Sequence, residues 1–219
     1  MAAIRVLIAD DHTIVREGLV SLLQSDSDLD LVGQAQDGRE ALRLALELEP
    51  DVVVMDISMP VLNGLEAARQ IRAQKPQIKI VVLSIHNEAS YVSSALRVGA
   101  NGYVLKSAAY EELKQAIQTT ARGETYLSPS ISTMVVEGYV TNVVVREKEM
   151  AYESLTPRQR ELLQLIAEGR TRREIAKMLG ISPKTVSRHR EDLMHNLNIN
   201  DDAGLVRFAV DLGIVDVSF

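Results

Sequence analysis

Residues 4–11 read Ile-Arg-Val-Leu-Ile-Ala-Asp-Asp, an apolar run that ends in two carboxylates. Three later runs follow the same plan: Val52–Met55 precedes Asp56, Ile80–Leu83 precedes Ser84, and Gly102–Leu105 precedes Lys106. Short runs rich in Val and Ile, separated by helical patterns, predict buried strands of a parallel sheet. Ligands of such sheets bind outside the carboxyl ends of the strands. We therefore expect one crevice, suited to a divalent cation and a phosphoryl group, to collect the side chains of Asp10, Asp11, Asp56, Ser84 and Lys106.

Strands and helices alternate along the whole first half of the chain. Apolar strands are predicted to begin near Ile4, Leu29, Val52, Ile78 and Gly102. Between and after them lie helical patterns near residues 12–24, 38–48, 64–73, 88–98 and 109–122. Five β/α units predict a five-stranded parallel sheet, doubly wound in the flavodoxin-like manner and with right-handed crossovers.

Length and composition are those of a globular protein. The chain has 219 residues, of which 46% are hydrophobic and 25% charged, so one large domain or two ordinary ones are expected. It lacks cysteine, which excludes disulfides and thiolate metal sites. No apolar stretch has membrane-spanning length and no signal peptide is visible, so we expect a cytoplasmic protein without a membrane partner.

The charge is distributed unevenly. Residues 1–125 hold 12 basic and 17 acidic residues, a net charge of −5. Residues 158–190 hold 9 basic and 3 acidic residues, a net charge of +6. A compact basic block in an acidic protein indicates a nucleic-acid face, and a solvated helix surface is the alternative.

The last third of the chain has a helical period throughout. Helices are predicted near residues 157–168, 172–179, 183–197 and 201–212. Thr156 and Thr171 each open a capping box, and Ser182-Pro183 is an N-cap followed by Pro at N1. The second and third helices, joined by a short turn at Gly180, have the layout of a helix-turn-helix. Residues 126–152, with Ser128-Pro129 at a helix start, are predicted to be a linker with one short helix.

These motifs together resemble the NarL/FixJ family of bacterial response regulators over essentially the whole chain. Residues 1–125 resemble a receiver domain of two-component signalling, through Asp10-Asp11, Met55-Asp56, Met59-Pro60, Asn63-Gly64, Ser84 and Tyr103–Lys106. Residues 153–219 resemble the LuxR-type four-helix DNA-binding domain, through Leu155–Glu161, Ile175-Ala176 and Thr185–Arg190. The order and spacing of the motifs make the resemblance specific.

The resemblance implies a role for each residue of the crevice. Asp11, Asp56 and the backbone carbonyl of Ser58 would coordinate Mg²⁺, with Asp10 acting mainly through water. Mg²⁺ suits such a set because it takes six oxygens and keeps several waters. Asp56 would attack a phosphohistidine and become an aspartyl phosphate. Lys106 would neutralise charge on the phosphoryl oxygens, and Ser84 would donate a hydrogen bond to one of them. Ser84 and Tyr103 would also act as a conformational switch.

Three neighbouring positions are less clear from the sequence. The broader receiver family often has a cis proline after the lysine, whereas this chain has Lys106-Ser107, for which we expect a trans bond or a different loop. For His12 the sequence favours a first-turn helical residue, and a metal ligand is the alternative. His86 is read either as a residue over the phosphoryl group or as an exposed loop histidine.

The helix-turn-helix assigns candidate DNA contacts. Val186, Leu193 and Leu197 share the face that packs inward, which leaves the opposite face for the major groove. Arg188 is expected to read guanine and Glu191 cytosine. Phosphate contacts give affinity without sequence information. The remaining candidate DNA contacts are Lys184, Thr185, Ser187, Arg190, Arg172 and Arg173.

The sequence thus predicts a transcription factor that is switched by Mg²⁺-dependent phosphorylation of Asp56 and is not itself an enzyme. Its expected partners are a sensor histidine kinase, double-stranded promoter DNA, RNA polymerase and a second copy of itself on paired half-sites. An aspartyl-phosphate phosphatase is the alternative, but such enzymes carry a second Asp where this chain has Ser58. An RNA-binding adaptor is disfavoured because aromatics for base stacking are not interleaved with the basic residues.

Overall fold

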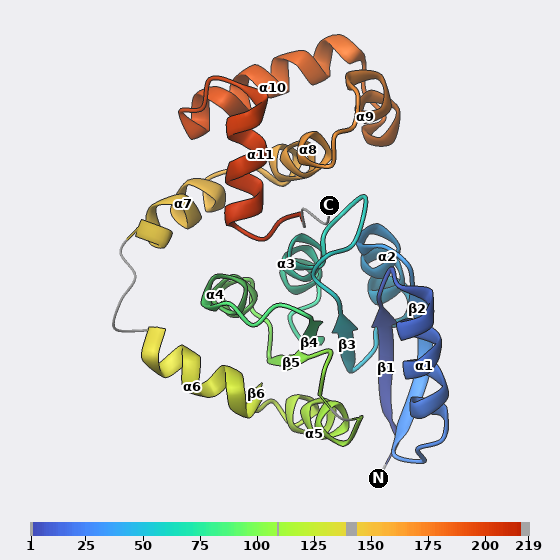
Figure 1. The fold of residues 1–219 in the computed structure, drawn as a ribbon. Coiled ribbons are helices and arrows are strands. Elements are labelled where there is room, and N and C mark those ends of the chain that lie inside the picture. Colours follow the sequence, from blue (N-terminus) through green and yellow to red (C-terminus); the bar gives the residue numbers. More distant parts are fainter. Residues whose placement is uncertain (1, 109, 139–143, 216–219) are drawn as a thin grey trace. The chain divides into compact units, whose positions relative to one another are not determined.

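The chain forms two units in the computed structural model, residues 1–140 and 141–219 (Figure 1). The structure describes residues 2–108, 110–138 and 144–215. Residues 109, 139–143 and 216–219, which the sequence assigns to a helix start, the linker and the end of the DNA-binding domain, lie outside the described residues. No helix within the described ranges is both long and apolar enough to cross a membrane.

A six-stranded sheet is the centre of the first unit (Figure 1). Its strands are β1 (Ile4–Ala9), β2 (Leu29–Ala35), β3 (Val52–Met55), β4 (Lys79–Ser84), β5 (Gly102–Leu105) and β6 (Tyr126–Leu127). Their order is β2-β1-β3-β4-β5-β6, and every neighbouring pair is parallel. The five predicted strands are confirmed, but β6 was not predicted. This two-residue strand satisfies the open edge of β5, where the Ser128 N–H donates to the Tyr103 carbonyl at 3.0 Å.

Helices cover both faces of the sheet, which explains why its strands are apolar without alternation. They are α1 (Thr13–Gln24), α2 (Gly38–Leu48), α3 (Gly64–Gln74), α4 (Ala89–Arg97) and α5 (Tyr110–Ala121). Leu7 and Val53 belong to one core with α2, α3 and α4. The alternate residues Val6 and Val54 belong to a second core with α1 and α5. The predicted doubly wound parallel fold is therefore confirmed.

Two helices occupy most of the segment predicted as a linker. In α6 (Pro129–Gly138), Ile131 is fully buried and joins the core beside α4. In α7 (Val144–Glu153), Ala151 and Tyr152 pack against the core of the second unit. Only one short helix was predicted, because the valines near residue 144 disfavour a helix. Packing of Ala151 and Tyr152 overrides that weak local preference. The domain boundaries at 125 and 153 stay a prediction.

The second unit contains four more helices: α8 (Pro157–Ala167), α9 (Arg172–Leu179), α10 (Pro183–Leu197) and α11 (Asp202–Asp211). Both predicted capping boxes form, at Thr156 and at Thr171, and the Ser182 side chain accepts from the Thr185 N–H. Gly180 ends α9 with φ of +65°, a left-handed conformation that glycine adopts without strain. The predicted helices, and the all-helical second domain, are confirmed.

The start of α3 is built directly against Asp56. A Cβ atom on Gly64 would lie 1.8 Å from the Asp56 carbonyl oxygen. The Gly64 N–H donates to the Ile57 carbonyl at 2.8 Å, and the Asn63 side chain caps α3 by accepting from the Glu66 N–H. The loop between β3 and α3 is therefore closed tightly around the strand end.

We expect Gly64→Ala to destabilise the protein by about 1–3 kcal/mol, because the added methyl group must push α3 away from the Asp56 backbone. Gly18→Ala is the matched control, since Gly18 lies inside α1 with nothing within 4 Å of the added Cβ. That change should stabilise by about 0.5–1 kcal/mol through helix propensity. Urea unfolding of the two variants measures both values, and equal effects would contradict the close approach.

Candidate functional site

The polar residues that follow the central strands lie at one edge of the sheet. Asp10 and Asp11 follow β1, Asp56 follows β3, Ser84 ends β4 and Lys106 follows β5. Main-chain hydrogen bonds fix the strand ends, because the Asp56 N–H donates to the Ala9 carbonyl and the Lys106 N–H to the Ser84 carbonyl, each at 2.8 Å. The strand register therefore brings these side chains together, as β1, β3, β4 and β5 are consecutive neighbours.

The Lys106 ammonium joins two of the carboxylates. Its Nζ lies 2.8 Å from Asp10 Oδ2 and 2.7 Å from Asp56 Oδ2. Both acids are buried, with 1% of Asp10 and 3% of Asp56 exposed. Removal of charges from water is costly unless they are paired. The lysine therefore neutralises part of the negative charge that the strands concentrate here.

Burial and charge shift the ionisation of this pair in a consistent way. Burial raises the pKa of Asp56, and the nearby Lys106 only partly opposes that rise. Burial alone would lower the pKa of Lys106, but the attraction of Asp56 and Asp10 raises it above the ordinary value. The lysine is therefore charged at neutral pH, and the Asp56 carboxylate is less stable as an anion than an exposed one.

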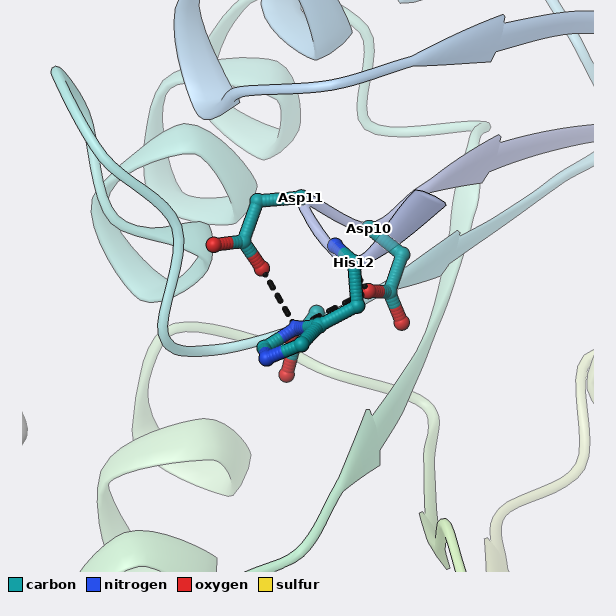
Figure 2. A group of neighbouring side chains, drawn as sticks. Asp10, Asp11 and His12 are labelled. Atoms are coloured by element: carbon teal, nitrogen blue, oxygen red, sulfur yellow. Dashed lines mark hydrogen bonds and ion pairs between the residues drawn. The ribbon is translucent and has the colours of Figure 1, made fainter. Parts of the chain in front are cut away.

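Ligand atoms of Asp10, Asp11, His12 and Asp56 all lie within 4.8 Å of one another. Figure 2 shows the first three of these side chains pointing toward one another from the end of β1. Carboxylate oxygens are the ligands that hard divalent cations prefer. Three carboxylates held this close repel each other, and a divalent cation relieves that repulsion. The cluster is therefore consistent with a metal site.

His86 is the neighbour of this site that the sequence described least well. Its Nε2 lies 3.3 Å from Ser58 Oγ, its ring stacks on Tyr91 with centroids 3.8 Å apart, and its side chain is 12% exposed. The backbone N–H of His86 donates to Ser84 Oγ at 3.2 Å. The exposed-loop reading of His86 is therefore wrong. The available signal was the short spacing between His86, in the loop after β4, and Tyr91, in the first turn of α4.

Tyr103 is linked to the same loop. Its side chain is fully buried in β5, and its hydroxyl donates to the His86 carbonyl at 2.8 Å. Burial raises the pKa of Tyr103, so the hydroxyl stays protonated and remains a donor.

The Lys106–Ser107 bond is trans, as expected, because the described residues contain no cis peptide bond.

Recognition-helix residues in α10 face two ways, as predicted. Val186 and Leu193 are buried, whereas Lys184, Arg188 and Glu191 are exposed. Four of the other candidate DNA contacts, Arg172, Ser187, Arg190 and Thr185, already have protein partners. Arg172 Nη1 donates to Ser187 Oγ at 3.1 Å, Arg190 Nε to Asp202 Oδ1 at 2.8 Å, and the Thr185 hydroxyl shares a hydrogen bond with Ser182.

The comparison with known proteins agrees with this architecture. A family model described as response regulator receiver domain matches residues 6–118, and one described as bacterial regulatory proteins, luxR family, matches residues 153–209. The chain is 39% identical over 212 residues to the transcriptional regulatory protein MctR of Rhizobium johnstonii, covering 97% of this chain and 95% of MctR.

Two solved structures are similar over nearly the whole chain. One is RcsB from Salmonella enterica serovar Typhimurium bound to promoter P1flhDC in the presence of phosphomimetic BeF3⁻, with 28% identity, a TM-score of 0.57, and coverage of 95% of this chain and 98% of that one. The other contains two RcsB dimers bound to two parallel DNAs, with 28% identity, a TM-score of 0.60, and coverage of 96% and 99%.

The chain therefore belongs to the NarL/FixJ family of response regulators, which join a receiver domain to a LuxR-type helix-turn-helix domain. It is a two-component response regulator and a DNA-binding regulator of transcription, a phosphoryl acceptor and not an enzyme that turns over a separate substrate. The family, function and non-enzyme predictions are confirmed. The roles of individual site residues stay predictions.

In metal-free buffer we expect Asp56→Asn to be more stable than the wild type at pH 7, because burial disfavours the Asp56 carboxylate and Lys106 only partly opposes that effect. The pKa of Asp56 is raised on folding, so the native state binds more protons than the unfolded state above the ordinary value of 3.8. Its contribution to stability therefore falls as pH rises through that window, and the advantage of Asn shrinks as pH falls. Unfolding titrations at pH 5 and pH 7 test this, and an advantage that grows on acidification would refute it.

Proposed function

We propose that a sensor histidine kinase transfers a phosphoryl group to Asp56 and that Mg²⁺, held by Asp10, Asp11, Asp56 and the backbone carbonyl of Ser58, supports the transfer. One observation carries this proposal: the Lys106 ammonium lies within 2.8 Å of both Asp10 and Asp56 in a buried crevice. An acid held only for packing or helix capping would have no need of a partly buried lysine and a carboxylate cluster.

The transfer assigns a task to each side chain. A carboxylate oxygen of Asp56 attacks the phosphorus, and the bond from phosphorus to the kinase histidine nitrogen breaks. Lys106 moves its charge from the carboxylates to the phosphoryl oxygens, and the Ser84 hydroxyl donates a hydrogen bond to one of them. When bound, Mg²⁺ supplies further positive charge against the same oxygens.

The switch we propose uses the loop that links Ser84 to Tyr103. Ser84 accepts from the His86 N–H, and Tyr103 donates to the His86 carbonyl. Movement of Ser84 toward a phosphoryl group would therefore move His86 and disturb the hydrogen bond of Tyr103. A switch can shift an equilibrium only through such a difference between states.

The output we propose is a homodimer that places two α10 helices on paired half-sites of promoter DNA and contacts RNA polymerase in the cytoplasm. One helix-turn-helix buries too little surface for tight specific binding. Half-sites about one helical turn apart match a two-fold protein. The dimers and the DNA complexes of RcsB support this arrangement by similarity.

Asp56 is expected to be the sole phosphoryl acceptor. With acetyl phosphate and Mg²⁺, intact mass should show one added phosphoryl group on the wild type and none on Asp56→Asn or in EDTA. Sedimentation and DNA affinity of the same samples should show a larger species and tighter binding only when Asp56 is modified. Labelling of the Asn variant would contradict the assignment of Asp56. Unchanged sedimentation and unchanged DNA affinity of the labelled wild type would contradict the switch.

Arg188 is expected to read sequence, whereas Lys184 holds the backbone. Arg188→Ala should cost about 1–3 kcal/mol on the cognate site and relax preference at one base pair. Lys184→Ala should weaken all sequences alike and lower the salt slope by about one unit. Titrations over a library of single base changes separate the two roles, and the reverse pattern would rule out this division.

A further inference from the structure

His12 has an unusual relation to the helix that it precedes. It is the N-cap residue of α1, but its side chain makes no capping hydrogen bond. Ser, Thr, Asp and Asn are preferred there because their oxygens accept from the first helical N–H groups. The imidazole therefore contributes nothing to the helix start, and its position must be explained by other neighbours.

Those neighbours are the carboxylates of the crevice. His12 Nδ1 lies 2.8 Å from Asp11 Oδ1 and 3.4 Å from Asp10 Oδ1, and Figure 2 shows both contacts as dashed lines. The backbone N–H of His12 also donates to Asp10 Oδ1 at 2.9 Å, which fixes the turn that presents the ring. The ring nitrogen is thus directed into the acidic cluster, although 63% of the side chain is exposed.

These separations match those between neighbouring ligands of one metal ion. Ligands about 2.1 Å from a metal lie about 3.0 Å apart in an octahedron and about 3.4 Å apart in a tetrahedron. Lys106 approaches Asp10 from its other oxygen, Oδ2. The lysine and the imidazole therefore lie at different oxygens of Asp10 and need not compete for one position.

We propose that His12 Nδ1 is a ligand of the metal bound by Asp10, Asp11 and Asp56, and that it makes the site prefer a divalent transition ion such as Mn²⁺ or Co²⁺ over Mg²⁺. The inference rests on the proposed function, because it uses the same carboxylates as the metal site. Mg²⁺ takes oxygen ligands, whereas imidazole nitrogen suits first-row transition ions. An imidazole directed at three carboxylates thus changes the class of ion that the site binds best.

The test compares two metals on the full-length protein at one fixed pH. Titration calorimetry gives the Kd of Co²⁺ and of Mg²⁺ for the wild type, His12→Ala and His12→Asn. The ratio of the Mg²⁺ Kd to the Co²⁺ Kd should fall about tenfold or more in both variants. Asn keeps a polar side chain but replaces the ring nitrogen with amide groups, so it separates nitrogen ligation from polar support.

A spectroscopic measurement identifies the ligand atom directly. The electron spin echo of the Mn²⁺-loaded wild type should show coupling to a nitrogen nucleus, and the two His12 variants should lose it. His195→Ala is the matched control, since His195 is an exposed histidine of α10 outside the cluster. That variant should keep both the coupling and the metal ratio.

Three outcomes would overturn the inference. Nitrogen coupling that survives in both His12 variants would mean that His12 is not a ligand. An equal change of both Kd values would mean that His12 only supports the carboxylates. Loss of coupling in His195→Ala would identify a surface site. If Mg²⁺ binds the wild type and Asp56 is still phosphorylated, such results leave the proposed function intact, whereas failure of both metals to bind would overturn both.

Discussion

Repulsion between carboxylates that the sheet cannot separate is the constraint on which the receiver unit depends. Helices cover both faces of the sheet, so β1 and β3 hold Asp10 and Asp56 in fixed positions. Charges held this way need a cation, and Lys106 supplies one from β5. A phosphoryl group on Asp56 would add further negative charge to the crevice. The fold thus holds closely spaced negative charges at the place where the proposed phosphoryl transfer would occur.

The same strand ends connect the crevice to the rest of the receiver. Lys106 and Ser84 are joined through the main chain, because the Lys106 N–H donates to the Ser84 carbonyl. Ser84 in turn binds His86, and His86 holds the Tyr103 hydroxyl. In the switch proposed above, movement of the serine hydroxyl would therefore reach the start of α4 through these hydrogen bonds and through the His86–Tyr91 stack. A short contiguous network of this kind is a physical route for coupling.

The sequence predicted what the parallel-sheet rule determines, and it missed what depends on distant packing. The convergence of Asp10, Asp56 and Lys106 followed from their positions at strand ends. Strand β6 and helix α7 are stabilised by contacts with β5 and with the second core, and local propensity carries no record of those contacts. The contacts of His86 with Ser58, 28 residues earlier, were hidden for the same reason.

The basic block of the second unit shows why net charge overstates a DNA face. Arg158, Arg170 and Arg190 each form an ion pair with a nearby acid, Glu161, Glu168 and Asp202 respectively. The Arg190 pair is exposed, 40% and 57% for its two side chains, and pairs of this kind contribute little free energy. Exchange of Asp202 for a phosphate would therefore cost little. In the division of roles proposed above, Arg190 would then add to affinity, as would Arg172, which donates to Ser187 of α10, while sequence preference would depend on Arg188.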